Sequence, residues 1–192
     1  MNILEVNNLS VKINKFTLNI NELSVKQGSI FHIKGKNGVG KTVFLNTLMG
    51  FMNYNGNLKI ATKDITGFIN NDSLIPYLYP AEYFKYLEKI SINNKYSENC
   101  KSFSDLLKFD LNEKKYIRDL SEGNKKKVGV ISILALESDL MIFDEPYAYL
   151  DDFSCNILDN LFTSKKADST IIFSSHQETN VADDSFDLHN YE

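Results

Sequence analysis

The sequence predicts an α/β fold in which a mostly parallel sheet is interrupted by a mostly helical segment. Two apolar runs in the last third of the chain, LMIFDEP (140–146) and STIIFSSH (169–176), carry this prediction. Continuous apolar runs of this kind are typical of strands that are buried on both faces of a parallel sheet. A helical pattern separates the two runs, and the β signal weakens between about residues 72 and 127.

The N-terminal part of the chain is expected to be rich in strands. Four short β-like runs, separated by Asn-rich and Gly-containing turns, are ILEV (3–6), LSVKI (9–13), FTLNI (16–20) and SIFHI (29–33). After the last run, SIFHIKGKNGVGKTVFLNTLMG changes from a strand through a Gly-rich loop to a helical pattern. Two further short strands are expected at LKI (58–60) and ITGFI (65–69).

Two helices are expected in the middle segment. PAEYFKYLEKI (80–90) begins with Pro80, which suits the first turn of a helix, and its large apolar side chains recur on one face. FSDLLKFDL (103–111) also has a helical pattern.

Composition predicts a soluble globular protein. The chain is 43% hydrophobic and 24% charged, which is ordinary for such a protein. Its net charge of −4 argues against a nucleic-acid partner bound through a broadly basic surface. Cys100 and Cys155 lack metal-ligand spacing and fit reduced thiols, although a disulfide between them stays open. The N-terminus does not resemble a signal peptide, and VGVISILAL (128–136) is too short to span a bilayer.

A Gly-rich loop carries the strongest chemical signal. Its residues, which match the phosphate-binding pattern G-x-x-x-x-G-K-[ST], are Gly35, Lys36, Asn37, Gly38, Val39, Gly40, Lys41 and Thr42. A strand before the loop and a helix after it make a chance Gly-rich turn the weaker interpretation. We expect backbone N–H groups to wrap the phosphates of ATP, Lys41 to reach the β- and γ-phosphates, and Thr42 to ligate Mg²⁺.

Two carboxylates end the apolar strand LMIFDE. Asp144 and Glu145 are expected at the carboxyl end of a buried strand, where open α/β sheets bind ligands. Asp144 suits the coordination or water shell of Mg²⁺, and Glu145 suits a general base that positions the attacking water. A solvated acidic turn would be the favoured interpretation of this pair alone, but not beside a phosphate-binding loop.

His176 ends the next predicted strand, IIFSSH. If this strand lies beside the one that carries the two carboxylates, His176 can donate to the γ-phosphate or orient Glu145. His32, inside a strand, and His189, near the C-terminus, are given no such role.

The stretch LSEGNKKKV (120–128) reads as a helix start with three lysines in its first turns, where the helix dipole disfavours cations. Ser121 is a good N-cap, and Gly123 leaves the backbone bare. Either an anion docks at this helix end, or the stretch is a charged solvated turn. Taken alone, the second interpretation is favoured.

Taken in order, these elements resemble the ATP-binding subunit of ABC transporters. The segments that carry the resemblance are GKNGVGKT (Walker A), LSEGN (the LSGGQ signature), LMIFDE (Walker B with the catalytic glutamate), AYLD at 148–151 (D-loop) and IIFSSH (switch histidine). The resemblance implies a P-loop NTPase core with a mostly parallel sheet, an N-terminal antiparallel β subdomain and a small helical subdomain. One domain, 1–192, would have its core in 1–71 and 128–192 and its helical subdomain in 72–127.

The resemblance also implies a composite site between two subunits. The signature helix end would contact ATP held by the second subunit, through Ser121, Gly123 and Asp151, and the nearby lysines would add positive field. Glu122 and Asn124 replace the commonest residues of the signature, Gly and Gln.

The Q-loop glutamine of the family is expected shortly after ITGF. The segment FINND (68–72) offers Asn70 or Asn71 instead, and spacing favours Asn71 as a metal residue of shorter reach. For the aromatic residue that stacks on adenine, no residue is assigned. Lys12 or Ile13 falls near the expected place, and Phe16 is more in keeping with the core.

The function that the resemblance implies is Mg-ATP hydrolysis by a head-to-tail homo- or heterodimer that powers a separate membrane-spanning subunit. The chain would be cytoplasmic and peripheral at the inner face of the cell membrane. The apolar, proline-containing stretch 73–80 would either dock that membrane subunit or cap the helical subdomain's core. Two alternatives stay open: a soluble ABC-type ATPase, for example in iron–sulfur cluster assembly, and a nucleotide-binding module with little turnover.

Overall fold

The computed structural model describes residues 1–176 and 179–188. Its strands are β1 (Asn2–Ile13), β2 (Phe16–Lys26), β3 (Ile30–Lys34), β4 (Asn55–Ile60), β5 (Ile65–Phe68), β6 (Leu140–Asp144), β7 (Thr170–Ser174) and β8 (Asp184–Asp187). Its α-helices are α1 (Lys41–Leu48), α2 (Pro80–Ile90), α3 (Tyr96–Leu106), α4 (Glu122–Leu136) and α5 (Asp152–Lys165), with short 3-10 turns at Asn71–Ser73 and Ile117–Asp119. No helix in these described ranges is long and apolar enough to cross a membrane.

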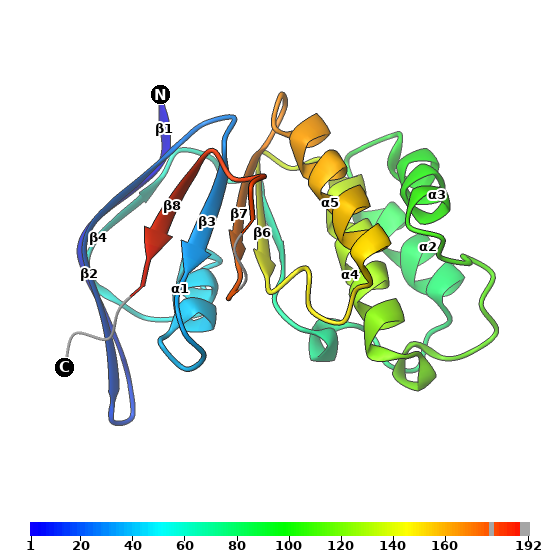
Figure 1. Ribbon diagram of the computed structural model, residues 1–192, viewed down its shortest axis with the longest axis horizontal. Coiled ribbons are helices and arrows are strands. Elements are labelled where there is room, and N and C mark those ends of the chain that lie inside the picture. Colours follow the sequence, from blue (N-terminus) through cyan, green and yellow to red (C-terminus); the bar gives the residue numbers. More distant parts are fainter. Residues whose placement is uncertain (177–178, 189–192) are drawn as a thin grey trace.

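A parallel sheet of five strands forms the centre of the molecule, in the order β5-β6-β7-β3-β8 (Figure 1). All four strand pairs in it are parallel, as the continuous apolar runs predict. β6 lies between β5 and β7, so the carboxyl ends of the strands that carry Asp144 and Ser174 are neighbours. The predicted α/β fold with a parallel sheet is confirmed.

An antiparallel sheet with the order β2-β1-β4 lies to one side of the parallel sheet (Figure 1). The runs predicted at 3–6 and 9–13 are one continuous strand, β1. The pairing of β1 with β4 shifts register between Asn7 and Ser10, and Asn8 has a φ of 50°. This irregularity takes up the polar Asn pair without ending the strand. Gly56 of β4 is required opposite it, because a Cβ there would collide with the backbone of Asn8.

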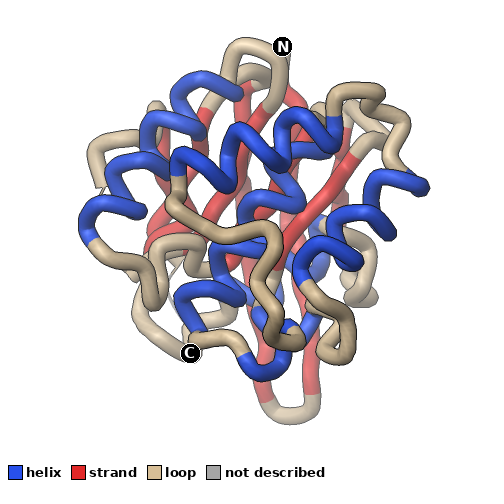
Figure 2. The backbone as a smooth tube through the Cα atoms, turned by 90° about the vertical axis from the view of Figure 1, so that its right-hand side faces the viewer, coloured by secondary structure: helices blue, strands red, loops and turns tan. Residues whose placement is uncertain are grey.

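Two apolar clusters cover the two faces of the parallel sheet. Leu140 and Ile142 of β6 join the cluster between the two sheets, to which α1 contributes Phe44, Leu45 and Leu48. The alternate residues of β6, Met141 and Phe143, join the cluster beneath α4 and α5. These helices, with α2 and α3 outside them, cover the face that looks away from the antiparallel sheet (Figures 1 and 2). Both faces of β6 are therefore buried.

The helical segment agrees with the sequence at α2 and differs at α3. The helix predicted at 103–111 instead spans Tyr96–Leu106, where Tyr96, Cys100 and Phe103 bury one face. It ends because Lys108 is in the left-handed region, with φ 52°, and the amides of Lys108 and Phe109 donate to carbonyls inside the last turn. The apolar residues after position 106 continue the core without continuing the helix.

α4 crosses the expected boundary at 127/128, since it runs without interruption from Glu122 to Leu136. The segment that starts at the signature therefore continues directly into the layer that packs on the parallel sheet. The division into core and helical subdomain stays a prediction, with one helix shared between the two parts.

Candidate active site

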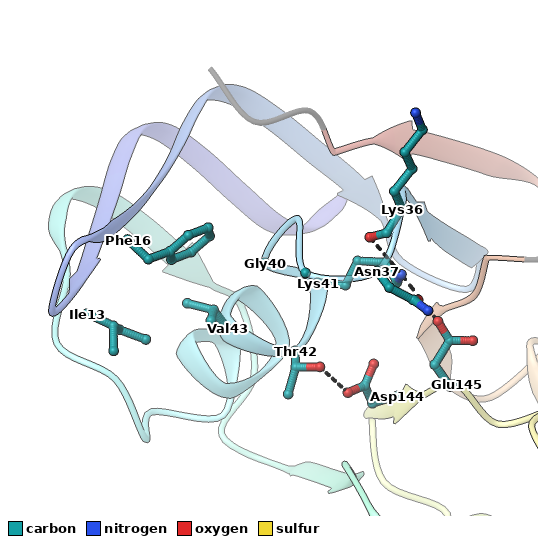
Figure 3. Close-up of a pocket in the computed structure, with 11 residues that line it drawn as sticks. Ile13, Phe16, Lys36, Asn37, Gly40, Lys41, Thr42, Val43, Asp144 and Glu145 are labelled. Atoms are coloured by element: carbon teal, nitrogen blue, oxygen red, sulfur yellow. Dashed lines mark hydrogen bonds and ion pairs between the residues drawn. The ribbon is translucent and has the colours of Figure 1, made fainter. Parts of the chain in front are cut away.

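A cavity of about 430 Å³ opens where the β1–β2 turn, the Gly-rich loop and the carboxyl end of β6 meet (Figure 3). It is lined by Ile13, Phe16, Lys36, Asn37, Gly38, Gly40, Lys41, Thr42, Val43, Asp144 and Glu145. The cavity thus joins an apolar end at the β1–β2 turn to a charged end at the two carboxylates. It has the size and mixed polarity of a small-molecule site.

The Gly-rich loop connects β3 to α1 and leaves the first backbone amides of α1 without a side-chain cap. Gly40, the residue before the helix, has a φ of 107°, and a Cβ there would lie 2.9 Å from the Phe16 ring. Any other residue at position 40 would be strained and would also displace the apolar wall of the cavity. The uncapped helix start favours a bound anion.

Lys41 is the buried cation of the site, with 6% of its side chain exposed. Its Nζ donates to the carbonyl oxygen of Gly35 at 2.8 Å and lies 3.2 Å from Oε1 of Glu145. The loop backbone therefore holds the ammonium group at the start of α1. In this position Lys41 can exchange its carboxylate partner for a phosphate oxygen.

Asp144, at the end of β6, is 6% exposed and has a partner on each carboxylate oxygen. The Thr42 hydroxyl donates to Oδ2 at 2.5 Å, and the Ser174 hydroxyl donates to Oδ1. A hydroxyl and a carboxylate are the hard oxygen ligands that Mg²⁺ prefers, so Thr42 and Asp144 fit a magnesium ion beside the phosphate loop.

Glu145 follows Asp144 with a φ of 46°, in the left-handed region that costs a non-glycine residue on the order of 1 kcal/mol. Its amide donates to the Ser174 hydroxyl at 3.0 Å. This conformation turns the side chain back toward Lys41, and the second oxygen, Oε2, lies 3.0 Å from Nδ1 of His176. Because an ionised carboxylate only accepts, His176 donates from Nδ1 in this contact. The structure thus joins Lys41, Glu145 and His176, and of these two contacts the sequence predicts only that of His176 with Glu145.

The signature segment begins α4 as expected. Ser121 is the N-cap, and its Oγ accepts from the amide of Asn124 at 3.3 Å. Gly123 lies against the D-loop, since a Cβ there would be 2.5 Å from the carbonyl oxygen of Tyr149. Asp151 caps α5 by accepting from the Ser154 amide at 2.7 Å, and this hydrogen bond lowers the pKa of Asp151.

The three lysines after the signature each have a partner inside the chain. Nζ of Lys125 pairs with Glu122 at 2.7 Å, and Nζ of Lys127 donates to the carbonyl oxygen of Leu107 at 2.8 Å. Lys126 is buried and donates to the carbonyl oxygen of Asp144 at 3.3 Å. Burial lowers the pKa of Lys126, and the nearby carboxylates oppose that change. Only part of the positive charge of the three lysines therefore acts at the N-terminus of α4.

Asn71 is not brought to Thr42 and Asp144. Its Nδ2 donates to Oε2 of Glu122 at 2.7 Å and, at 3.3 Å, to the backbone oxygen of the same residue. Asn70 instead caps the short turn that follows, where its side chain accepts from the Ser73 amide. Two of the departures from the family pattern, Asn71 and Glu122, are therefore hydrogen-bonded to each other. The hydrogen bond from Lys125 and then that from Asn71 lower the pKa of Glu122.

Sequence reasoning missed two residues of the site. Phe16 is partly buried and packs on the core, as expected, but it also lines the apolar end of the cavity with Ile13 (Figure 3). The Ser174 hydroxyl forms hydrogen bonds with both Asp144 and Glu145. The only sequence signal for Ser174 is a hydroxyl at the end of an apolar strand.

Comparison with known proteins identifies the family. Residues 18–148, more than half of the chain, match the model of the ABC transporter family. The chain is a member of the ABC transporter family. This ABC protein is 31% identical to the lipoprotein-releasing system ATP-binding protein LolD of Buchnera aphidicola, over 90% of the chain and 86% of that relative.

Two further comparisons agree with this assignment. The ABC protein is 30% identical to the taurine import ATP-binding protein TauB of Escherichia coli, over 69% of the chain and 56% of that longer relative. An ABC transporter ATP-binding protein from Pyrococcus furiosus has the same fold, with a TM-score of 0.79, 22% identity and 96% coverage of both chains.

The ABC protein is thus an ATP-binding and ATP-hydrolysing subunit that powers a transporter. Neither the family match nor these relatives support a soluble ATPase of another class.

Proposed function

We propose that this subunit hydrolyses Mg-ATP in the cavity between the Gly-rich loop and the end of β6. The observation that carries the proposal is the ion pair of Lys41 with Glu145, which joins the phosphate-binding cation to the candidate base. The triphosphate would replace Glu145 as the partner of Lys41. Glu145 would then be free to accept a proton from the attacking water while His176 keeps the carboxylate oriented.

Mg²⁺ would be held by the Thr42 hydroxyl and the Asp144 carboxylate, directly or through water. The ion would neutralise charge on the β- and γ-phosphates as the leaving oxygen develops negative charge. The adenine ring would lie at the apolar end of the cavity, against Phe16 and Ile13, which line it. The remaining loop residues, Lys36, Asn37, Gly38 and Val39, would surround the phosphates with backbone amides.

A second subunit, of the same or a different kind, would complete the site. Ser121 and Gly123 lie at the start of α4, and Gly123 packs on the backbone of the D-loop, which also leads to Asp151. The close approach of these two segments supports a single surface that faces ATP bound to the second subunit.

Replacing Ser121 by Arg is expected to spare ATP binding by the monomer and to reduce hydrolysis at least tenfold. The large side chain would occupy the space for the partner's γ-phosphate. Phosphate release, measured beside binding of a fluorescent nucleotide, checks this. Mixing Ser121→Arg with Lys41→Ala should rebuild at most one composite site per dimer. Full activity of Ser121→Arg alone would exclude the role in trans.

The membrane subunit would bind the surface around Tyr77, at the cytoplasmic, inner face of the membrane. Some residues of the stretch 73–80 contribute to the core of the helical subdomain, and others are exposed and available for docking. Leu74 is buried and Leu78 packs on the core, whereas Tyr77 is 66% exposed beneath the guanidinium of Arg118, 4.8 Å from its ring centre. The backbone there is held in place, since the backbone amide of Arg118 donates to the carbonyl oxygen of Pro76. An exposed Tyr–Arg pair on a fixed backbone suits a partner surface.

Changing Tyr77 to Ser is expected to leave the melting temperature and basal ATPase nearly unchanged and to abolish co-purification with a co-expressed membrane subunit. Tyr86→Ser, at an exposed tyrosine of α2, serves as the matched control and should still co-purify. Normal co-purification of Tyr77→Ser would place the docking surface elsewhere.

A further inference from the structure

The peptide group between Asp144 and Glu145 is held at both ends by side chains from other elements. Its carbonyl oxygen accepts from Nζ of Lys126 at 3.3 Å, and its N–H donates to the Ser174 hydroxyl at 3.0 Å. Lys126 comes from α4 and Ser174 from the neighbouring strand β7. The orientation of this peptide group decides where the Glu145 side chain begins.

Glu145 needs such support because its backbone is in the left-handed region, with a φ of 46°. A non-glycine residue keeps this conformation only where its surroundings hold it. If the peptide group rotated toward an ordinary conformation, the carboxylate would leave the position where it meets both Lys41 and His176.

Lys126 itself is fixed by its surroundings. It is only 4% exposed, and its Nζ lies 5.0 Å from the centre of the Phe68 ring at the end of β5. One turn later, Gly129 lets the same ring lie directly against α4, because a Cβ there would collide with it. Burying an ammonium group costs desolvation free energy unless its partners are in place. An apolar side chain would fill this core position without that cost.

Ser174 is also buried, and its hydroxyl serves as both acceptor and donor. The oxygen accepts from the Glu145 amide and the hydrogen is donated to Oδ1 of Asp144. The Ser174 side chain therefore orients both the amide of Glu145 and the Asp144 carboxylate that suits Mg²⁺.

We propose that Lys126 and Ser174 are positioning residues that hold the Asp144–Glu145 peptide group and thereby aim the Glu145 carboxylate at the attacking water. This inference rests on the proposed function. Because Ser121 is the N-cap of α4, Lys126 also ties the position of Glu145 to the helix that begins at the signature.

The test compares Lys126→Met and Ser174→Ala with wild type and with Glu145→Gln. Methionine keeps the length of the lysine side chain and removes its charge and donor. Both variants are expected to lower kcat, about 100-fold for Lys126→Met and about tenfold for Ser174→Ala, with the affinity for ATP within threefold of wild type. Both variants should thus show the same kind of defect as Glu145→Gln, a lower kcat with ATP binding retained, but to a smaller extent.

Lys165→Met is the matched control for lost stability. Lys165 is also a largely shielded lysine, with 14% of its side chain exposed, its Nζ 5.1 Å from the centre of the Phe103 ring and a salt bridge to Glu137. Its removal should lower the melting temperature and leave kcat unchanged. A merely structural role for Lys126 would give that same result.

Several outcomes would overturn the inference. A kcat within twofold of wild type in both Lys126→Met and Ser174→Ala would do so, as would a loss of ATP affinity parallel to the loss of kcat. If Lys126→Met does not fold, the same two quantities, kcat and the affinity for ATP, are measured on Ser174→Ala and Lys126→Arg instead and judged by the same criteria. An inactive wild-type protein would instead count against the proposed function, which keeps the two failures distinct.

Discussion

Glu145→Gln is expected to abolish steady-state ATP hydrolysis, with a loss of roughly 10²- to 10⁴-fold, and to keep ATP binding. The amide keeps the shape of the side chain and loses the group that accepts the proton of water. It also removes the negative partner of Lys41, so affinity for ATP should stay equal or rise. Phosphate release and equilibrium nucleotide binding, measured on the same preparation, check both halves.

With Mg-ATP, Glu145→Gln should also accumulate as a dimer on size-exclusion chromatography, because the enclosed nucleotide is not cleared. Glu88→Gln, at an exposed carboxylate of α2, is the control and should match wild type. Loss of nucleotide binding in Glu145→Gln would contradict the role assigned to this carboxylate.

Lys41→Ala is expected to weaken ATP binding itself, by about 10- to 100-fold, because a buried charge-assisted contact to the phosphates is lost. The stability of the folded state should fall less than the affinity for ATP, because the partner Glu145 is 25% exposed and retains its contact with His176. Titration with a fluorescent ATP analogue measures the change, and Lys63→Ala, at an exposed lysine, controls for net charge. Unchanged affinity would exclude the phosphate-binding role of the loop.

The site elements that the sequence predicts best are those whose chemistry depends on neighbours along the chain. The loop from Gly35 to Thr42 is defined by glycine spacing, and the Asp144–Glu145 pair is defined by the apolar strand before it. Burial of every residue of β6, with alternate side chains in the two apolar clusters, follows from a parallel sheet covered on both faces. The position of His176 follows if the two strands are neighbours, which β6 and β7 are.

The features that the sequence did not predict depend on contacts between distant residues. The bond of Asn71 to Glu122 spans 51 positions, so the spacing after ITGF could not reveal that this amide turns away from Thr42 and Asp144. Phe16 reaches the cavity because the β1–β2 turn lies over Gly40. The predicted end of α3 is wrong because the apolar pattern continues past Leu106, where the helix ends just before the left-handed Lys108.

The most direct test of the central claim is phosphate release from Mg-ATP by the purified wild-type chain, with EDTA and Glu145→Gln as parallel controls. The arrangement of Lys41, Thr42, Asp144 and Glu145 predicts release that saturates with ATP and is lost in EDTA and in Glu145→Gln. A wild-type chain that binds ATP and releases no more phosphate than Glu145→Gln would contradict the assignment of this site as the centre of hydrolysis.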